Sequence, residues 1–321
     1  MNHQRFVIRE SESLSEIARG MGWDLQFDQL ERGRFSSVVD YAGTDETQFF
    51  HKRYHRALCV HGAVPAGMAT FLLPAHRPKA ASFCGDAITP GKLCALMPGD
   101  QGAIRTAAGY DYLTCCFAVE RLDRALRVLC RRTLSEVLPH TAETSAPVES
   151  VARLQSAAQA VFVPTAGPDE VPEPAAADLA SEERVLAALC AALTDGEPPR
   201  PGPLAPRNRW RCVRAVRDYA EAHLGEGLGL ETLCRISSVS ERTLTTAFRE
   251  VTGLSPQQFI KARRLTAARQ ALVGARRTDR SIKSVALGLG FWHLGHFARD
   301  YKAHFDESPS ETLARPQAGS E

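Results

Sequence analysis

The stretch from residue 290 to residue 301 carries the side chains best suited to chemistry with a nucleic acid. It opens with a glycine, and Phe297 and Tyr301 lie four residues apart, so a helix would turn both of them inward. His296 and Arg299 then fall mostly on the opposite, exposed face. Arginine can form paired hydrogen bonds to guanine, and histidine can donate to an acceptor on a base or phosphate, so this face suits a DNA groove.

The distribution of charge indicates the same part of the chain. Residues 207–315 hold 19 Lys and Arg against 11 Asp and Glu, whereas the remaining residues hold 20 against 26. A basic C-terminal third on an acidic body indicates a polyanion partner for that third alone. A solvated basic face is the alternative that charge by itself leaves open.

The bulk composition is that of an ordinary globular chain. Of 321 residues, 44% are hydrophobic and 24% are charged, and this length suits two domains. The first 19 residues lack the apolar segment of a signal peptide, and the sequence has no run of 18 apolar residues. We therefore expect a cytoplasmic protein with no membrane partner. Nine scattered cysteines fit reduced thiols.

Metal and catalytic chemistry find little support in the sequence. His51, His55, Cys59 and His61 could suggest a metal, but the surrounding residues predict a strand, and a surface cluster is favoured. The sequence has no Gly-rich phosphate loop, no Gly-x-Ser-x-Gly elbow and no His-Glu-x-x-His motif. We therefore expect no metal site, no catalytic residues and no enzyme.

The N-terminal half is predicted to be rich in strands. Residues 1–20 suggest a loosely ordered arm or a short helix, and short apolar runs alternate with turns over about residues 23–119. The runs cover residues 35–41, 57–60, 68–73, 93–97 and 112–119, and the turns cover residues 42–43, 64–67, 89–91 and 98–100. This pattern favours a barrel or sandwich, which can enclose one small ligand.

From residue 120 the apolar spacing changes to that of helices. Leu122, Leu126 and Leu129 predict an amphipathic helix, and helical spacing continues to about residue 163. The leucine stripe suggests that these helices form a homodimer. The sensor and dimerisation domain is accordingly placed at residues 1–163.

A proline-rich linker is predicted over residues 164–206. It contains a short helix at about residues 179–193 and five prolines among residues 197–206. Because proline fixes φ and lacks an N–H donor, the second stretch can be neither helix nor central strand. We place the domain boundary there.

The region after the linker, residues 207–315, is predicted to be all helical, followed by a tail at residues 316–321. Ser240 suits an N-cap, and Gly253 suits a helix end of positive φ. Ser255 and Ser308 each precede a proline and begin a capping box. These signals divide the region into short helices around one long helix.

The same region repeats itself with an offset of about 53 residues. The matched pairs are Leu233 with Val285, Val239 with Phe291, Leu244 with Phe297, Phe248 with Tyr301 and Pro256 with Pro309. One helix-turn-helix is a weak signal, because any helical bundle has short turns. Two copies in register, both followed by Ser-Pro caps, predict two helix-turn-helix units joined by the long helix.

Residues 211–315 resemble the DNA-binding domain of the AraC/XylS family of bacterial regulators. The matching residues are Leu233, Ser240, Arg242, Leu244, Phe248, Gly253, Ser255, Pro256, Arg264, Leu265, Ala268, Ile282, Val285, Ala286, Gly290, Phe291, Phe297, Arg299, Tyr301, Phe305, Ser308 and Pro309. The run over residues 290–298 further resembles a subgroup that includes the ethanolamine-utilisation regulator. The resemblance does not extend into residues 1–205.

The resemblance implies two recognition helices, at about residues 240–251 and 293–304, in successive major-groove turns. The residues expected to face DNA are Arg242, Thr245, Thr246, His293, Gly295, His296 and Arg299. Trp292 is expected to pack in the turn. Thr246 stands where the family often has a longer polar or basic residue, and Asp306 stands where it usually has glycine.

The fold class is therefore α+β, with a strand-rich N-terminal sensor and an all-helical C-terminal domain. The resemblance implies a transcription regulator that binds a double-stranded DNA operator, an unidentified small-molecule effector and, if it activates, RNA polymerase. No other cofactor is expected. The alternatives are a ligand-independent DNA-binding protein and an enzyme fused to such a domain. A fused repair methyltransferase would need a Cys beside Pro and before His-Arg, a context that the sequence lacks.

Overall fold

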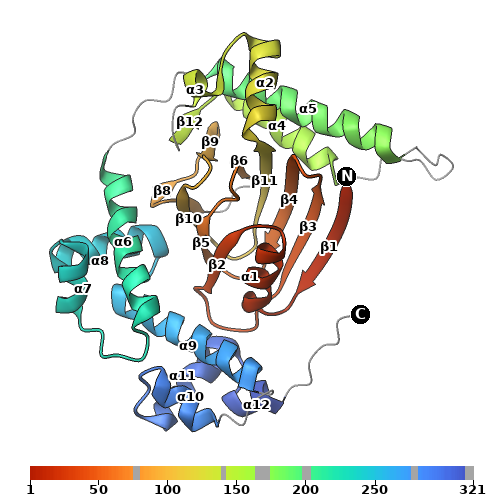
Figure 1. The fold of residues 1–321 in the computed structure, drawn as a ribbon. Coiled ribbons are helices and arrows are strands. Elements are labelled where there is room, and N and C mark those ends of the chain that lie inside the picture. Colours follow the sequence, from red (N-terminus) through yellow and green to blue (C-terminus); the bar gives the residue numbers. More distant parts are fainter. Residues whose placement is uncertain (75–79, 139–141, 163–173, 197–203, 276–280, 315–321) are drawn as a thin grey trace.

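The computed structural model describes residues 1–74, 80–138, 142–162, 174–196, 204–275 and 281–314. Two antiparallel sheets and their covering helices form the N-terminal half, and a group of helices forms the C-terminal half (Figure 1). The predicted α+β class is confirmed.

The larger sheet has seven strands. In spatial order these are β1 (Asn2–Ile8), β3 (Ser37–Gly43), β4 (Thr47–Tyr54), β11 (Tyr110–Ala118), β6 (Met68–Pro74), β9 (Lys92–Leu96) and β12 (Ala142–Ser145). The smaller sheet contains β2 (Asp24–Gln29), β5 (Leu58–Ala63), β10 (Gln101–Thr106), β7 (Ala81–Phe83) and β8 (Asp86–Ala87). An apolar core with residues from both sheets lies between them.

Strand β11 shows how the larger sheet is buried on both faces. Tyr112 and Cys116 belong to the core between the sheets, whereas Leu113, Cys115 and Phe117 belong to a second core under the helices. Successive side chains of a strand point to opposite faces, so one strand supplies both cores. This is why the segment is apolar almost throughout and shows no polar alternation.

The second core is closed by α2 (Val119–Cys130), α3 (Leu134–Val137), α4 (Val148–Ala160) and α5 (Pro174–Asp195). Leu122 and Leu126 of α2 are fully buried within this chain, while Val128 and Leu129 are exposed. Helix α5 packs against α2 and α4, and its Leu189 is buried. The short helix expected in the linker is therefore part of the N-terminal half, because its apolar side chains belong to the second core and pack against α2 and α4.

Strands form at the five predicted apolar runs, and the turn glycines Gly67, Gly91 and Gly99 have positive φ. The prediction of a loosely ordered arm is wrong for residues 2–8, which form β1 and pair with β3, whereas the alternative prediction of a short helix is confirmed by α1 (Ser11–Gly20). The partners of β1 lie about 30 to 40 residues away in β3, so no local sequence pattern predicts the strand.

The C-terminal half consists of α6 (Leu204–Ala222), α7 (Leu230–Ser237), α8 (Glu241–Thr252), α9 (Pro256–Ala275), α10 (Ile282–Gly288), α11 (Leu294–Phe305) and α12 (Pro309–Ala314). Residues 164–173 and 197–203 of the expected linker and the tail at residues 316–321 lie outside the described residues. The prediction that residues 197–206 cannot be helical is wrong at its end, because α6 begins at Leu204 and the first turn of a helix tolerates Pro206. The capping boxes are confirmed, because the side chain of Ser255 accepts from the Gln258 N–H and that of Ser308 from the Glu311 N–H.

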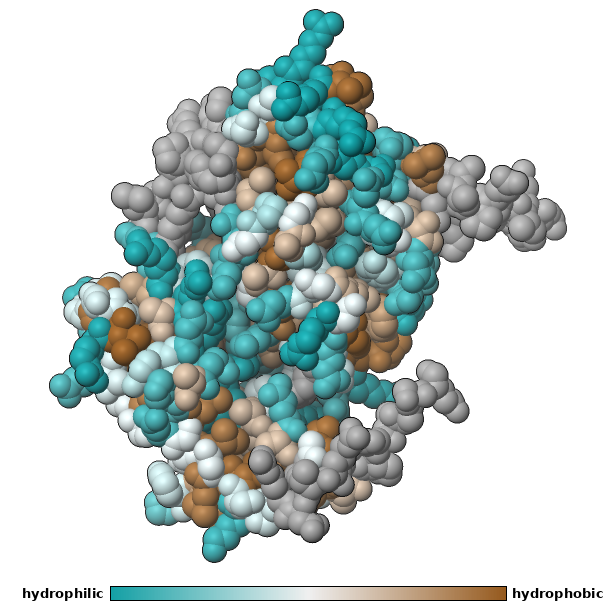
Figure 2. Space-filling model, viewed as in Figure 1, coloured by the Kyte–Doolittle hydropathy of each residue, from teal (hydrophilic) through white to brown (hydrophobic). Residues whose placement is uncertain are grey.

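The described part of the chain contains no helix long and apolar enough to cross a membrane. Hydrophilic side chains dominate the face drawn in Figure 2, and apolar ones occur there in small separate groups. Within the same described residues, no group of His, Cys, Asp and Glu is arranged to hold a metal ion. His51 instead bonds to Asp111, and His61 to Asp28.

Candidate DNA-binding interface

The first helix-turn-helix unit consists of α7 and α8. Ser238 ends α7 in the left-handed region at φ 55°, and the Ser240 side chain caps α8 by accepting from the Thr243 N–H. Leu244 and Phe248 turn inward and are fully buried. The outer face of α8 is thereby held in one orientation.

The second unit consists of α10 and α11 and repeats this design. Gly290 makes the turn at φ 77°, and Phe291 packs on Phe297 with ring centroids 4.9 Å apart. Phe297 and Tyr301 are buried, as Leu244 and Phe248 are in the first unit. The predicted internal repeat is therefore present as two units with separate cores.

Helix α9 joins the two units. Its 20 residues span about 30 Å at 1.5 Å per residue. One turn of B-DNA is about 34 Å long, so a rigid helix of this length matches the spacing of two successive major-groove turns. The structure shows this connecting element as one uninterrupted helix.

Both recognition helices present their candidate DNA residues outward. Arg242, Thr246, His293, Gly295, His296 and Arg299 are exposed, and Thr245 is half-buried. The rings of His293 and His296 lie 5.5 Å apart at the start of α11. The N-terminal half therefore leaves these faces open.

Trp292 differs from expectation. Its side chain is 70% exposed, so the packing role predicted for it in the turn is wrong. Phe291 occupies the inner side of the turn against Phe297, and the neighbouring Trp292 points outward. A large aromatic side chain thus stands beside the exposed His293 and His296.

The N-terminal half contacts the C-terminal helices through the outer face of the smaller sheet. Asp28 of β2 accepts hydrogen bonds from Arg263 of α9 and from His61 Nε2, the latter at 2.7 Å. His61 Nδ1 in turn accepts from Arg217 of α6 at 3.0 Å. Arg263 also donates to Glu221 at 2.6 Å.

Burial and the neighbouring charges together set the protonation states of Asp28 and His61. Burial alone would raise the pKa of Asp28, but Arg263 and His61 outweigh it and hold the pKa well below its usual range. Burial lowers the pKa of His61, so the imidazole stays neutral, donating from one nitrogen and accepting at the other. The surface cluster predicted around His61 is wrong, because His61 is buried. Asp28, Arg217 and Arg263 were not predicted, although a lone Asp inside a strand is a signal that could have indicated the first of them.

Two helices with outward faces, α8 and α11, similar in build and joined by the single helix α9, define a bipartite helix-turn-helix DNA-binding domain. The profile of a family described as "Helix-turn-helix domain" matches residues 233–315. Residues 233–315 are an AraC-type helix-turn-helix domain, similar to the C-terminal domains of AraC/XylS-family transcriptional activators.

The relatives are regulators. The chain is 38% identical over 103 residues to XylDLEGF operon transcriptional activator 2 of Pseudomonas putida, covering 32% of this chain and 66% of that protein. It is 36% identical over 93 residues to the HTH-type transcriptional activator RhaS of Enterobacter sp. strain 638, covering 29% and 32%. It is 41% identical to a probable AraC family transcriptional regulator of Rhodopseudomonas palustris CGA009, with a TM-score of 0.31, covering 33% of this chain and 98% of that structure. The matches to the two activators span less than two thirds of their lengths.

Proposed function

We propose that the protein is a sequence-specific transcription regulator whose α8 and α11 read successive major-groove turns of one operator. The observation that carries this is the outward exposure of Arg242 and Arg299 on two helices joined by α9. Each guanidinium can bind guanine O6 and N7 together, an interaction that contributes about 1–3 kcal/mol of discrimination. Their neighbours Thr245, Thr246, His293, Gly295 and His296 complete the two surfaces.

We assign residues 1–196 to an effector-binding sensor and residues 204–314 to the DNA-binding domain. Contact between the halves supports this assignment, because the smaller sheet touches both α6 and α9 through the buried network at Asp28. A change in the sheet can therefore alter the position of the helices that carry the DNA contacts. If the protein activates transcription, RNA polymerase is a further partner.

A homodimer remains a proposal with a narrower basis. Most of the leucine stripe that suggested it is buried within the chain itself. Val128 and Leu129 of α2 remain outside, with 76% and 56% of their surfaces exposed. Sedimentation of the purified chain at micromolar concentration tests this, and a monomer would exclude it.

The DNA-binding proposal is tested with Arg299→Ala. Operator sites are first selected from random duplexes with the full-length protein. The variant should then bind a selected site about 5- to 150-fold more weakly than wild type, the equivalent of about 1–3 kcal/mol, and lose less on random DNA. An equal loss on both would mean that Arg299 contacts only phosphate.

Two variants serve as references for that measurement. Arg235→Ala removes the same charge from α7, off the recognition helices, and should lower binding to both DNAs alike. Arg242→Ala should show the same preference as Arg299→Ala but a smaller effect, because the short Thr246 adds little to the first surface.

A further inference from the structure

A lysine is buried between the two sheets, away from the DNA-binding surface. Lys52 of β4 is only 8% exposed, and its Nζ lies 3.3 Å from Thr114 Oγ1, the hydroxyl to which it donates. The ammonium also lies over the rings of Phe50, Tyr112 and Trp23, at 4.7, 5.3 and 5.5 Å from their centroids. Among the described residues, no carboxylate forms an ion pair with it.

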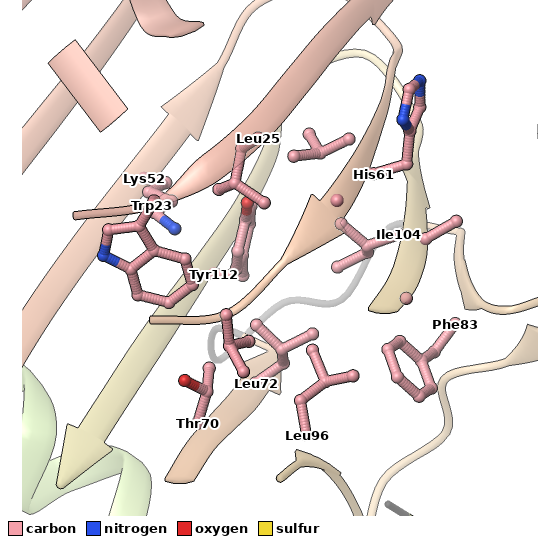
Figure 3. Close-up of a pocket in the computed structure, with 15 residues that line it drawn as sticks. Trp23, Leu25, Lys52, His61, Thr70, Leu72, Phe83, Leu96, Ile104 and Tyr112 are labelled. Carbon is pink, nitrogen blue, oxygen red and sulfur yellow. The ribbon is translucent and has the colours of Figure 1, made fainter. Parts of the chain in front are cut away.

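Lys52 borders a pocket whose walls are mostly apolar (Figure 3). The apolar wall includes Leu25, Val60, Leu72, Phe83, Leu96 and Ile104. The cavity volume is about 40 Å³, which is room for a few water molecules, so the side chains around it must move apart to admit an organic ligand. Thr70 and Tyr112 add hydroxyl groups to this wall, and Trp23 and His61 also border the pocket.

A buried cation in such a place has an energetic consequence. Burial lowers the pKa of Lys52 to about 8, so near pH 7 most molecules still carry the charge. A desolvated ammonium without a counter-ion is costly, and the faces of aromatic rings compensate only part of that cost. An anion placed beside Nζ would restore the missing interaction through a charge-assisted hydrogen bond.

We propose that this pocket binds a small organic acid, with its carboxylate at Lys52 Nζ and a compact apolar body against Leu72 and Ile104. The assignment rests on the proposed sensor role of the N-terminal half and names the chemistry of its effector. One ammonium balances one carboxylate, whereas a phosphate dianion would leave a second charge among apolar side chains. A neutral molecule would fill the space but leave Lys52 without a counter-ion.

The pocket and the contact with the DNA-binding domain share the same strands. On β5, Val60 faces the pocket while the neighbouring His61 points away from it, toward Arg217 (Figure 3). On β10, Ile104 belongs to the inner core, and Ala103 packs in the core of the first helix-turn-helix unit. An acid that displaces β5 and β10 therefore also moves the side chains on the opposite face of the smaller sheet, which pack against the C-terminal helices.

The test compares acids with their amides on the full-length protein. Cyclohexanecarboxylate, phenylacetate and hexanoate should each raise the thermal unfolding midpoint of wild type and give measurable heats of binding, whereas the three amides should not. Lys52→Met should abolish the response to the acids. Lys92→Met removes a half-buried lysine of β9 that does not line the pocket, and this variant should respond to the acids as wild type does.

Equal binding of acids and amides, equal binding to wild type and Lys52→Met, or no response to any acid at millimolar concentration would overturn the assignment. If Lys52→Met does not fold, the pH dependence in wild type decides. Affinity for an acid should be constant at pH 6–7.5 and fall about tenfold per pH unit above about 8, as Lys52 loses its proton. Flat affinity through this range would overturn it equally.

The groups facing Lys52 do not titrate in that range. Burial raises the pKa of Cys116 to about 12 and that of Tyr112 well above its usual value, so both stay neutral. The outcome is also separable from the sensor role. Acid binding without a change in operator affinity would support the acid site and contradict the sensor role. A neutral molecule that alters operator affinity would support the sensor role and contradict the acid site.

Discussion

The two helix-turn-helix units have the same design but different attachments to the rest of the chain. The first joins the N-terminal half through a shared apolar core that includes Cys59 and Ala103. The second has a core of its own and meets the N-terminal half at the end of α11, where the carbonyl of His304 accepts from the Gly33 N–H at 3.0 Å. Apolar burial thus holds the first unit, whereas polar contacts hold the second, including the ion pair between the buried Arg269 of α9 and Glu10 of the N-terminal half.

The two surfaces that we propose to read DNA differ as well. The first offers Arg242 with the short side chains of Thr245 and Thr246, whereas the second offers two histidines, Arg299 and an exposed tryptophan. The unit with the richer surface is therefore the one held less firmly. We infer that the first unit anchors the domain and that changes in the sheet act mainly on how the second unit is presented to DNA.

The largest expected effect comes from breaking the buried attachment with Asp28→Ala. This change leaves Arg263 buried with only Glu221 as a partner, and removing one member of a buried ion pair costs about 3–5 kcal/mol. The urea midpoint of the full chain should fall accordingly. Asp24→Ala, an exposed position on the same strand, should leave it unchanged.

The attachment of the second unit supplies the contrast. Arg34 and Asp306 are both mostly exposed and 3.6 Å apart, so Arg34→Ala should produce no measurable change in the urea midpoint. A similar loss in Arg34→Ala and Asp28→Ala would contradict the difference between the two attachments.

Acid should reduce the effect of Asp28→Ala. The pKa of Asp28 is lower in the folded chain than in the unfolded chain, so its stabilisation is complete above the unfolded value, near 4, and is lost as pH falls below it. The difference in stability between wild type and variant should therefore be full at pH 6 and shrink below about pH 4. A constant difference down to pH 2 would mean that Asp28 acts by packing alone.

Local signals made much of the C-terminal domain predictable. Caps at Ser240, Ser255 and Ser308 and the repeat of inward aromatic residues depend on neighbours within a few positions, and all are present. The reading faces follow from helical periodicity, which places Arg242 and Arg299 outside. Trp292 was misplaced because either it or Phe291 could fill the turn, and only packing selects one.

Long-range contacts explain what was missed. Strand β1 depends on β3, the helix α5 depends on a core built by α2 and α4, and Asp28 meets Arg263 across 235 positions of sequence. Lys52 gave a partial signal, because it stands between Phe50 and Tyr54 on the inward face of β4. A charged residue at an inward position of a strand indicates a possible ligand contact.

Helix caps allow a finer comparison of the two units. Ser240→Ala removes the hydrogen bond to the Thr243 N–H and should destabilise the chain by about 1 kcal/mol. At the matching position of α11, the side chain of His293 makes no capping hydrogen bond, so His293→Ala should leave the unfolding midpoint unchanged. In operator binding, His293→Ala should weaken the complex, because we propose that its exposed imidazole faces the groove. Destabilisation by both variants would show that His293 is structural.

The smallest effect concerns the residues that end the two recognition helices. Gly253 and Asp306 both lie in the left-handed region, at φ 79° and 59°. Glycine adopts this conformation without a steric penalty and aspartate does not, so Asp306→Gly should stabilise the chain by roughly 0.5 kcal/mol, since the exposed ion pair with Arg34 contributes little. Gly253→Ala should have the opposite sign, because the new Cβ would also lie 3.0 Å from Arg105 Nη1 of the sheet. Urea titration of both variants measures the two signs, and a loss of stability in Asp306→Gly would mean that the aspartate side chain holds the second unit to the N-terminal half more strongly than its exposure indicates.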